Sequence, residues 1–339
     1  MRWLVPVLVT LFMLPDGSRA QTGYVPQQEN VRAQLAILAH DSMEGRRTAT
    51  AGAVRAARYI ASVMQAIGLE PGGDQGYVQR VPLANRPGRG GRMGLQPLVT
   101  QAALDSVPEA QRIYDANLIG IIRGVDPALR DSAIIVGAHY DHVGMRAHQS
   151  GDSIYNGADD DASGVVAVLE AARALKSGPP PKRTVVFVAF TGEEMGGLGS
   201  RYYIARPPVP LASTVAQLQV EMIARPDSLV GGAGKAWLTG FERSTMGELL
   251  RTAGIEVAAD PRPSQSFFTR SDNVRFARIG IPAHTLSSFN LHAEYHQPSD
   301  EIERVDYAHM AELVRAVARA VRVLADGAAP RWHPNGRPQ

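Results

Sequence analysis

Apolar residues recur every three or four positions near the start of the chain, as they do on the buried face of a helix. Between Gln28 and Gly68 this pattern predicts two helices. A polar turn, the range 40–46, separates them. The second helix is expected to run from Thr50 and to stop at Gly68, because glycine commonly ends a helix.

From Asn117 onward, short apolar runs alternate with helical patterns. The predicted strands are 118–122, 133–138, 184–190, 215–222 and 281–286, and the predicted helices are 163–175, 244–253 and 307–324. Strands that alternate with helices favour a mostly parallel sheet covered by helices on both faces. We therefore predict an α/β fold with a mostly parallel, mixed central sheet, arranged as a three-layer sandwich.

Three parts of the chain fall outside this alternation or bound it. The range 85–97 is rich in glycine, arginine and proline and has no hydrophobic period, so we predict an irregular insertion at about 85–116. The range 21–329 is expected to form a single domain. The range 330–339 is expected to be a disordered tail.

The range 1–20 is typical of a signal peptide. Arg2 gives a positive start, the range 3–14 is apolar, and Ser18-Arg19-Ala20 offers the small residues that a signal peptidase reads. An apolar run of this length is too short to span the ~30 Å hydrocarbon core of a bilayer. We therefore expect cleavage after Ala20, export to the periplasm or the medium, and no stable membrane association afterwards.

Composition narrows the choice of function. Hydrophobic residues make up 45% of the chain and charged residues 20%, which excludes an intrinsically disordered protein. The formal net charge of +2 is too balanced to indicate nucleic acid or an anionic membrane as a partner. The chain has no cysteine, so any metal must be held by histidine, aspartate and glutamate.

Acidic residues and histidines gather where the predicted strands end. The stretches are AHYD at 138–141, GADDDASG at 157–164, TGEE at 191–194, VE at 220–221, and YHQPSD at 295–300 in a later loop. The carboxyl ends of parallel strands meet at one edge of the sheet, which is where α/β proteins bind ligands. Like charges gathered in a partly desolvated cleft repel one another, and a divalent cation removes that conflict.

Each stretch alone has an ordinary structural explanation. An aspartate-rich turn before a helix usually caps that helix, a Gly-Glu-Glu loop is usually solvated, and a single histidine is more often structural than a metal ligand. The prediction of a metal site therefore depends on all of the stretches occurring together.

In these stretches the sequence resembles the two-zinc aminopeptidases of metallopeptidase family 28 (clan MH), whose relatives include glutamate carboxypeptidase and glutaminyl cyclase. The resemblance begins near Asn30 and also includes Glu44-Gly45-Arg46 and Ser271-Asp272. It implies that 21–329 is a catalytic metallopeptidase domain that acts on peptides. It also implies two zinc ions and a set of ligands. These ligands are His139 and Glu221 for one ion, Glu194 and His296 for the other, and Asp160 as the bridge between them.

The resemblance further implies roles for the residues beside the ligands. Glu193 would act as the general base, taking a proton from the attacking water and giving it to the leaving amine. Asp141, two residues after His139, would face the same side of a strand and could fix the tautomer of that histidine; the alternative is that it caps the backbone or forms an ion pair nearby. A non-proline cis peptide bond after Asp160 is expected as well.

Several assignments stay open from the sequence alone. Glu221 stands where the family often has aspartate, and Asn273 where it often has histidine. His292 lies four residues before His296 and is a rival for its role as ligand. His142 is expected to be structural, with lining of the cleft as the alternative. Tyr295 could donate to a developing oxyanion or simply pack.

The leading functional hypothesis is a zinc-dependent exopeptidase that removes the N-terminal residue of peptides. The alternatives are a glutaminyl cyclase-like acyltransferase, which would use one zinc ion, a carboxypeptidase-like hydrolase, and a zinc-binding protein without activity. No residue identifies the preferred side chain, although Phe267-Phe268 is a candidate apolar wall. The oligomeric state stays open.

Overall fold

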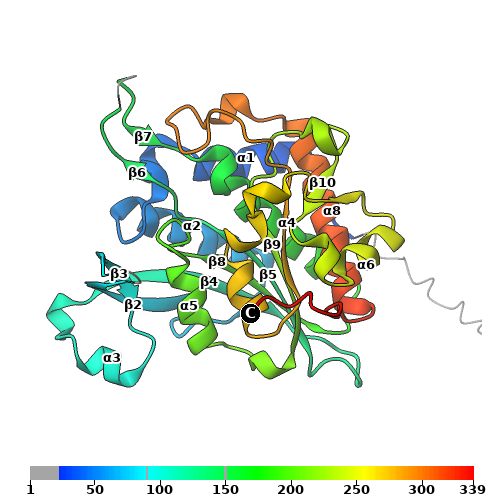
Figure 1. Cartoon of the computed structure of the whole chain (residues 1–339), viewed down its shortest axis with the longest axis horizontal. Coiled ribbons are helices and arrows are strands. Elements are labelled where there is room, and N and C mark those ends of the chain that lie inside the picture. The colour runs from blue at the N-terminus through cyan, green and yellow to red at the C-terminus, as the bar shows by residue number, and fades with distance from the viewer. Residues whose placement is uncertain (1–22, 89–90, 149–150) are drawn as a thin grey trace, which may run out of the picture.

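The protein is built on a mixed ten-stranded sheet (Figure 1). The computed structural model describes residues 23–88, 91–148 and 151–339. Strand order is β11-β10-β12-β9-β5-β8-β4-β2-β3, with β1 paired to β4. The strands are β1 (Glu70–Pro71), β2 (Val78–Pro87), β3 (Met93–Pro97), β4 (Ile113–Ile122), β5 (Ala133–His139), β8 (Thr184–Phe190), β9 (Thr214–Val220), β10 (Ala236–Leu238), β11 (Val257–Ala259) and β12 (Ala283–Ser287).

The centre of the sheet is parallel. Strands β12, β9, β5 and β8 run in the same direction, and β4, β2 and β3 continue the sheet antiparallel on the far side of β8. On the other edge β10 is antiparallel to β12 and parallel to β11. The predicted class, a mostly parallel mixed sheet in an α/β fold, is confirmed.

Every residue of β5 and β8 is buried, because helices cover both faces of the sheet. Alternate side chains of β5 enter separate cores: Ile134 packs in one and Ile135 in the other. The first core is covered by α1 (Gln28–Leu38), α2 (Ala51–Ile67), α4 (Gly164–Ser177), α6 (Met246–Thr252) and α8 (Tyr307–Asp326). The second core is covered by α5 (Leu198–Ala205) and α7 (Asn273–Arg278).

The two N-terminal helices form as predicted. The Thr50 side chain accepts a hydrogen bond from the backbone N–H of Ala53 at the start of α2, and Gly68 ends that helix with a left-handed φ of 78°. The polar turn between the helices is a short 3-10 segment, Asp41–Arg46. Its last residue, Arg46, is fully buried.

Most of the described residues in the range 85–116 lie in regular elements, so the predicted irregular insertion is wrong. Strands β2 and β3 form an antiparallel pair there, followed by α3 (Gln101–Asp105) and the start of β4. Strand β2 is paired with β4, which lies later in the chain, and local sequence does not reveal this pairing.

The range 330–339 is also ordered, contrary to expectation. The indole N–H of Trp332 donates to the carbonyl of Gly280 at 2.8 Å, and Trp332 forms a β-bridge with Ser244. The aromatic side chain packs against the second core, which gives this short segment a fixed position.

The predicted signal peptide at 1–20 lies outside the described residues. In the part of the chain that the structure does describe, no helix combines the length and the apolar character that crossing a bilayer requires.

Candidate metal centre

The parallel strands bring their carboxyl ends to one edge of the sheet, and the predicted site residues lie there. His139 is the last residue of β5, Glu193 and Glu194 follow β8, and Glu221 follows β9. Asp160 lies in the irregular helical turn Ala158–Ser163 before α4. His296 lies in the loop between β12 and α8. Residues far apart in the sequence therefore converge because the strands are parallel neighbours.

The first cluster consists of His139, Asp160, Glu221 and Glu193. The Nε2 atom of buried His139 lies 3.2 Å from Oδ1 of Asp160 and 3.1 Å from Oε1 of Glu221. The carboxylate of Glu193 lies within 4.8 Å of the ligand atoms of His139 and Glu221. Nδ1 of His139 donates to the main-chain carbonyl of Asp141 at 3.0 Å, which leaves the lone pair of neutral imidazole on Nε2.

This arrangement fits a cation. Nε2 of His139 has no hydrogen-bond partner among the described residues, and its lone pair faces two carboxylate oxygens. Acceptors that face one another in a buried place repel, and a divalent metal ion makes the contact favourable. Neutral imidazole and carboxylate are also the donor types that zinc accepts.

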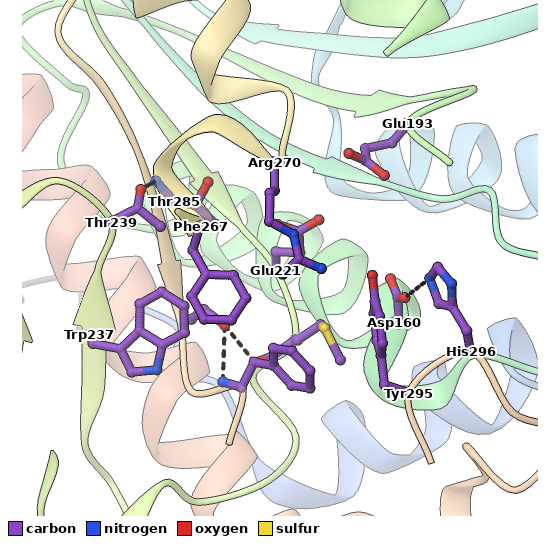
Figure 2. Close-up of a pocket in the computed structure, with 13 residues that line it drawn as sticks. Asp160, Glu193, Glu221, Trp237, Thr239, Phe267, Arg270, Thr285, Tyr295 and His296 are labelled. Atoms are coloured by element: carbon purple, nitrogen blue, oxygen red, sulfur yellow. Dashed lines mark hydrogen bonds and ion pairs between the residues drawn. The ribbon is translucent and has the colours of Figure 1, made fainter. Parts of the chain in front are cut away.

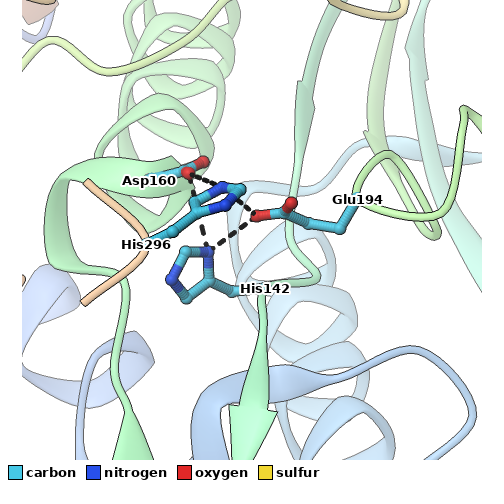
Figure 3. A group of neighbouring side chains, drawn as sticks. All are labelled: His142, Asp160, Glu194 and His296. Atoms are coloured by element: carbon cyan, nitrogen blue, oxygen red, sulfur yellow. Dashed lines mark hydrogen bonds and ion pairs between the residues drawn. The ribbon is translucent and has the colours of Figure 1, made fainter. Parts of the chain in front are cut away.

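The second cluster consists of His296, Asp160, Glu194 and His142 (Figure 3). The Nε2 atom of His296 lies 3.0 Å from Oδ2 of Asp160 and 3.0 Å from Oε1 of Glu194. Nδ1 of His142 lies 2.9 Å from the same Glu194 oxygen. Asp160 thus presents one carboxylate oxygen to each cluster, as a bridging ligand must.

Arg46 supports the turn that carries Asp160. Its buried guanidinium donates to the main-chain carbonyls of Tyr140 at 2.7 Å, Asn156 at 2.5 Å and Gly157 at 2.9 Å. The peptide bond between Asp160 and the next residue is cis, as the family resemblance implied. The guanidinium of Arg46 therefore holds the chain just before Asp160 against the end of β5.

Two further carboxylates hold the backbone of this turn. Asp300, the last residue of YHQPSD, accepts hydrogen bonds from the N–H groups of Asp159 and Asp160, each at 3.1 Å to Oδ2. Asp161 accepts from the N–H groups of His139 at 3.2 Å and Met222 at 3.0 Å. The Asp159 carboxylate also accepts from a backbone N–H, that of Ala224 at 2.8 Å, so neither acidic neighbour of Asp160 belongs to a cluster.

The carboxylate of Asp141 does not make the contact with His139 that the sequence favoured. Its carboxylate oxygen lies 3.7 Å from Nδ1 of His139, beyond hydrogen-bond distance, and the main-chain carbonyl of Asp141 makes the contact instead. The chain leaves the strand after His139, so the alternation that the prediction assumed ends there. The carboxylate accepts instead from the N–H groups of Glu193 at 3.0 Å and Glu194 at 3.4 Å.

The two adjacent glutamates have opposite pKa shifts. Burial raises the pKa of Glu193 well above its usual range, and the charge of Glu221 acts in the same direction while His139 opposes it. Burial and the charge of Asp160 also raise the pKa of Glu194, but hydrogen bonds from His142 and His296 outweigh them and lower it to about 2. Glu193 is therefore the better proton acceptor and Glu194 the more persistent anion.

A cavity of about 470 Å³, open to solvent, adjoins both clusters (Figure 2). Its apolar wall consists of Met222, Trp237, Phe267 and Phe289. Of the pair predicted as an apolar wall, Phe267 lines the cavity, whereas Phe268 packs in the second core.

Arg270 and Tyr295 also line this cavity. The guanidinium of Arg270 lies over the Phe267 ring, 4.9 Å from its centroid. Figure 2 shows it pointing toward the gap between Glu221 and Tyr295. The Tyr295 ring stacks on His296, with ring centroids 3.9 Å apart.

The structure separates the two rival histidines. His292 contacts Oδ2 of Asp159 through Nε2 at 3.0 Å and belongs to neither cluster, whereas His296 lies in the second cluster. His142, expected to be structural, lies in that cluster too. Its only signal in the sequence was its place in AHYDH, three residues after His139.

The fold and the site define a class: an α/β protein with two carboxylate–imidazole clusters, joined by one aspartate, at the carboxyl edge of its sheet. Comparison with known proteins gives this class a name. The sequence profile of peptidase family M28 matches residues 117–321, and the chain belongs to that family.

Individual relatives agree with this assignment. Aminopeptidase YwaD of Bacillus subtilis is 29% identical over 198 residues, a match that covers 54% of this chain and 41% of that protein. The chain spans about half the length of the curated relatives it matches.

Solved structures share the fold over nearly the whole chain. An aminopeptidase from Aneurinibacillus sp. strain AM-1 has a TM-score of 0.64 at 16% identity, covering 91% of this chain and 96% of that one. A glutaminyl cyclase from Porphyromonas gingivalis has a TM-score of 0.61 at 17% identity, covering 88% and 98%. At these identities the similarity shows the fold and does not distinguish between the two activities.

Proposed function

We propose that this protein is a zinc-dependent aminopeptidase with two zinc ions, which hydrolyses the N-terminal residue from peptides. The observation that carries the proposal is the position of Asp160, whose two carboxylate oxygens face separate clusters. The first site would be held by His139, Asp160 and Glu221, and the second by Asp160, Glu194 and His296.

Bound zinc ions would supply Lewis-acid polarisation of the scissile carbonyl and would lower the pKa of water. Glu193 takes the proton of the attacking water and transfers it to the leaving amine. Three features of Glu193 support this role: its carboxylate is beside the first cluster, its pKa is raised, and its backbone N–H is held by Asp141. Asp141 is thus a positioning residue that fixes the turn carrying the base.

The cavity supports a preference for apolar N-terminal side chains. Its aromatic wall offers contact area to a side chain that extends from the reacting carbonyl. Arg270 places a positive charge at the same cavity, which disfavours lysine or arginine as the N-terminal residue. Peptides with an apolar N-terminal residue are therefore the proposed substrates.

The presence of both clusters favours the aminopeptidase over the glutaminyl cyclase alternative. A one-zinc enzyme would not need an aspartate whose oxygens face two sets of ligands. The experiment is a metal count on the purified chain together with assays on aminoacyl chromogenic substrates, N-blocked peptides and peptides with N-terminal glutamine. Two zinc ions with hydrolysis of only the unblocked substrates support the proposal. One zinc ion with cyclisation of N-terminal glutamine refutes it.

Replacement of the proposed base provides a sharper test. Glu193→Gln removes the proton acceptor and keeps the size of the side chain, so turnover should fall by a factor of about 10² to 10⁴. The zinc content should stay at the wild-type level. Glu242→Gln, at a solvent-exposed position, is the matched control and should leave both quantities unchanged. Near-normal turnover in Glu193→Gln would show that another group accepts the proton.

A further inference from the structure

His142 is a buried imidazole beside the metal centre that has no part in the mechanism above. It lies three residues after His139, beyond the end of β5, and is 1% exposed. We propose that His142 is a fourth protein ligand in the second cluster and that the two metal sites are consequently unequal in affinity. This inference rests on the proposed two-zinc function.

Geometry is the first argument. Nδ1 of His142 lies 2.9 Å from Oε1 of Glu194 and 3.7 Å from Oδ2 of Asp160. Nε2 of His296 lies 3.0 Å from each of the same two oxygens. In a tetrahedral zinc site with bonds of 2.0–2.1 Å, neighbouring ligand atoms are about 3.3 Å apart. The four atoms, which all lie within 4.8 Å of one another, have the spacing of such a site.

The competing role is a simple hydrogen bond from Nδ1–H of His142 to Glu194. Nε2 of His142 is buried without a partner among the described residues, and it stays unpaired in either role, so it does not distinguish a metal ligand from a hydrogen-bond donor. The direction of Nδ1 distinguishes the two roles. It faces two oxygens from two different residues, and His296 approaches both of these oxygens as well. Two imidazole nitrogens that face the same pair of carboxylate oxygens are arranged as the ligands of one metal ion are.

Packing fixes the ring in this position. Gly157 has a left-handed φ of 56°, and a Cβ atom built on it would lie 2.5 Å from Cδ2 of His142. Only glycine therefore allows the imidazole to lie this close to the backbone before Asp160. The His142 and His296 rings meet edge to face, with centroids 5.4 Å apart. The imidazole is held between the glycine and the second histidine.

The assignment makes the two sites different. The second would have His142, Asp160, Glu194 and His296, which is the four-ligand set of a closed zinc site. The first would have His139, Asp160 and Glu221, which is the three-ligand set that leaves a position open for water or substrate. We therefore expect the second site to retain its ion and the first to exchange it.

Stepwise metal removal tests the difference. Purified wild-type protein, dialysed against increasing chelator, should lose one zinc ion readily and hold the other at least about tenfold more tightly. His142→Ala should abolish that gap, so that both ions leave together. His292→Asn is the matched control, because the side chain of His292 is also near the site and only 7% exposed but contacts Asp159 instead of either cluster. It should keep the wild-type gap.

A second measurement needs no variant and does not depend on how well His142→Ala folds. X-ray absorption of the wild-type protein carrying one zinc ion should show two imidazole ligands, from His142 and His296. A single imidazole, or a wild-type retention gap in correctly folded His142→Ala, overturns the proposal. The proposed function fails separately: two bound zinc ions without aminopeptidase activity would refute the activity, and the imidazole count would still decide the role of His142.

Discussion

His284 is a buried histidine whose protonation should set part of the pH dependence of stability. It lies in β12, far from solvent, and both ring nitrogens are satisfied in the neutral form. Nδ1–H donates to the carbonyl of Thr239 at 2.7 Å, and Nε2 accepts from the hydroxyl of Ser244 at 2.6 Å. Burial lowers the pKa of His284 to about 4, and the charge of Arg243 adds to the effect against the opposing Thr239 contact.

The magnitude follows from the pKa difference. In the unfolded chain this histidine titrates near its ordinary pKa of 6.5, so below that pH the unfolded state binds a proton that the folded state excludes. The contribution of neutral His284 to the free energy of unfolding is therefore fully present above pH 6.5 and is lost as the pH falls toward 4. At about 1.4 kcal/mol per pKa unit, the loss is about 3 kcal/mol in total.

The assay compares urea unfolding of the wild type and of His284→Gln across a pH series. Other buried groups and any loss of metal at low pH affect both proteins, so the difference between their unfolding free energies isolates His284. This difference should shrink by about 2 kcal/mol between pH 7.5 and pH 5. Gln65→Ala, at an exposed residue without a titratable side chain, is the control and should show a constant difference. A constant difference for His284→Gln as well would refute the reasoning.

Two further substitutions test the cavity and the support of the site. Arg270→Ala removes a repulsion of about 1 kcal/mol, so kcat/KM for an N-terminal lysine substrate should rise about fivefold relative to leucine; an unchanged ratio places the substrate side chain elsewhere. Arg46→Ala leaves several buried carbonyls without a donor, at about 1–3 kcal/mol for each group, so the free energy of unfolding should fall by about 4 kcal/mol or more. A loss below about 1 kcal/mol in urea unfolding would mean that other donors replace the guanidinium.

Parts of the fold could be predicted because the local sequence carries their full signal. Thr184–Phe190 forms β8 with the predicted bounds, since a strand buried on both faces appears in sequence as an unbroken apolar run. Strands β2 and β3 were missed because they carry arginine, asparagine and proline and depend on pairing with β4. Their stability comes from tertiary contacts that no local pattern contains.

The candidate site likewise contains residues that could be predicted from the sequence and residues that could not. His139 and Glu194 could be placed together because parallel strands end at a common edge. His142 could not, because its direction depends on the turn after β5, where strand alternation no longer applies. The choice between His292 and His296 likewise depends on loop conformation: His296 has a left-handed φ of 55°, which sequence spacing does not indicate.

The contacts of Arg46 and Thr48 limit how far this protein can be truncated from its N-terminal side. The shared family profile covers 117–321, which contains every proposed ligand and the proposed base. Arg46 ties the turn before Asp160, and the hydroxyl of Thr48 donates to Asp141 at 3.1 Å, yet both lie upstream of that stretch. A fragment limited to 117–321 would contain the proposed ligands and the proposed base. It would lack the Arg46 guanidinium and the Thr48 hydroxyl, which hold the backbone before Asp160 and the carboxylate of Asp141 in place. A design that grafts this site onto another protein would therefore have to include the segment 46–48 as well.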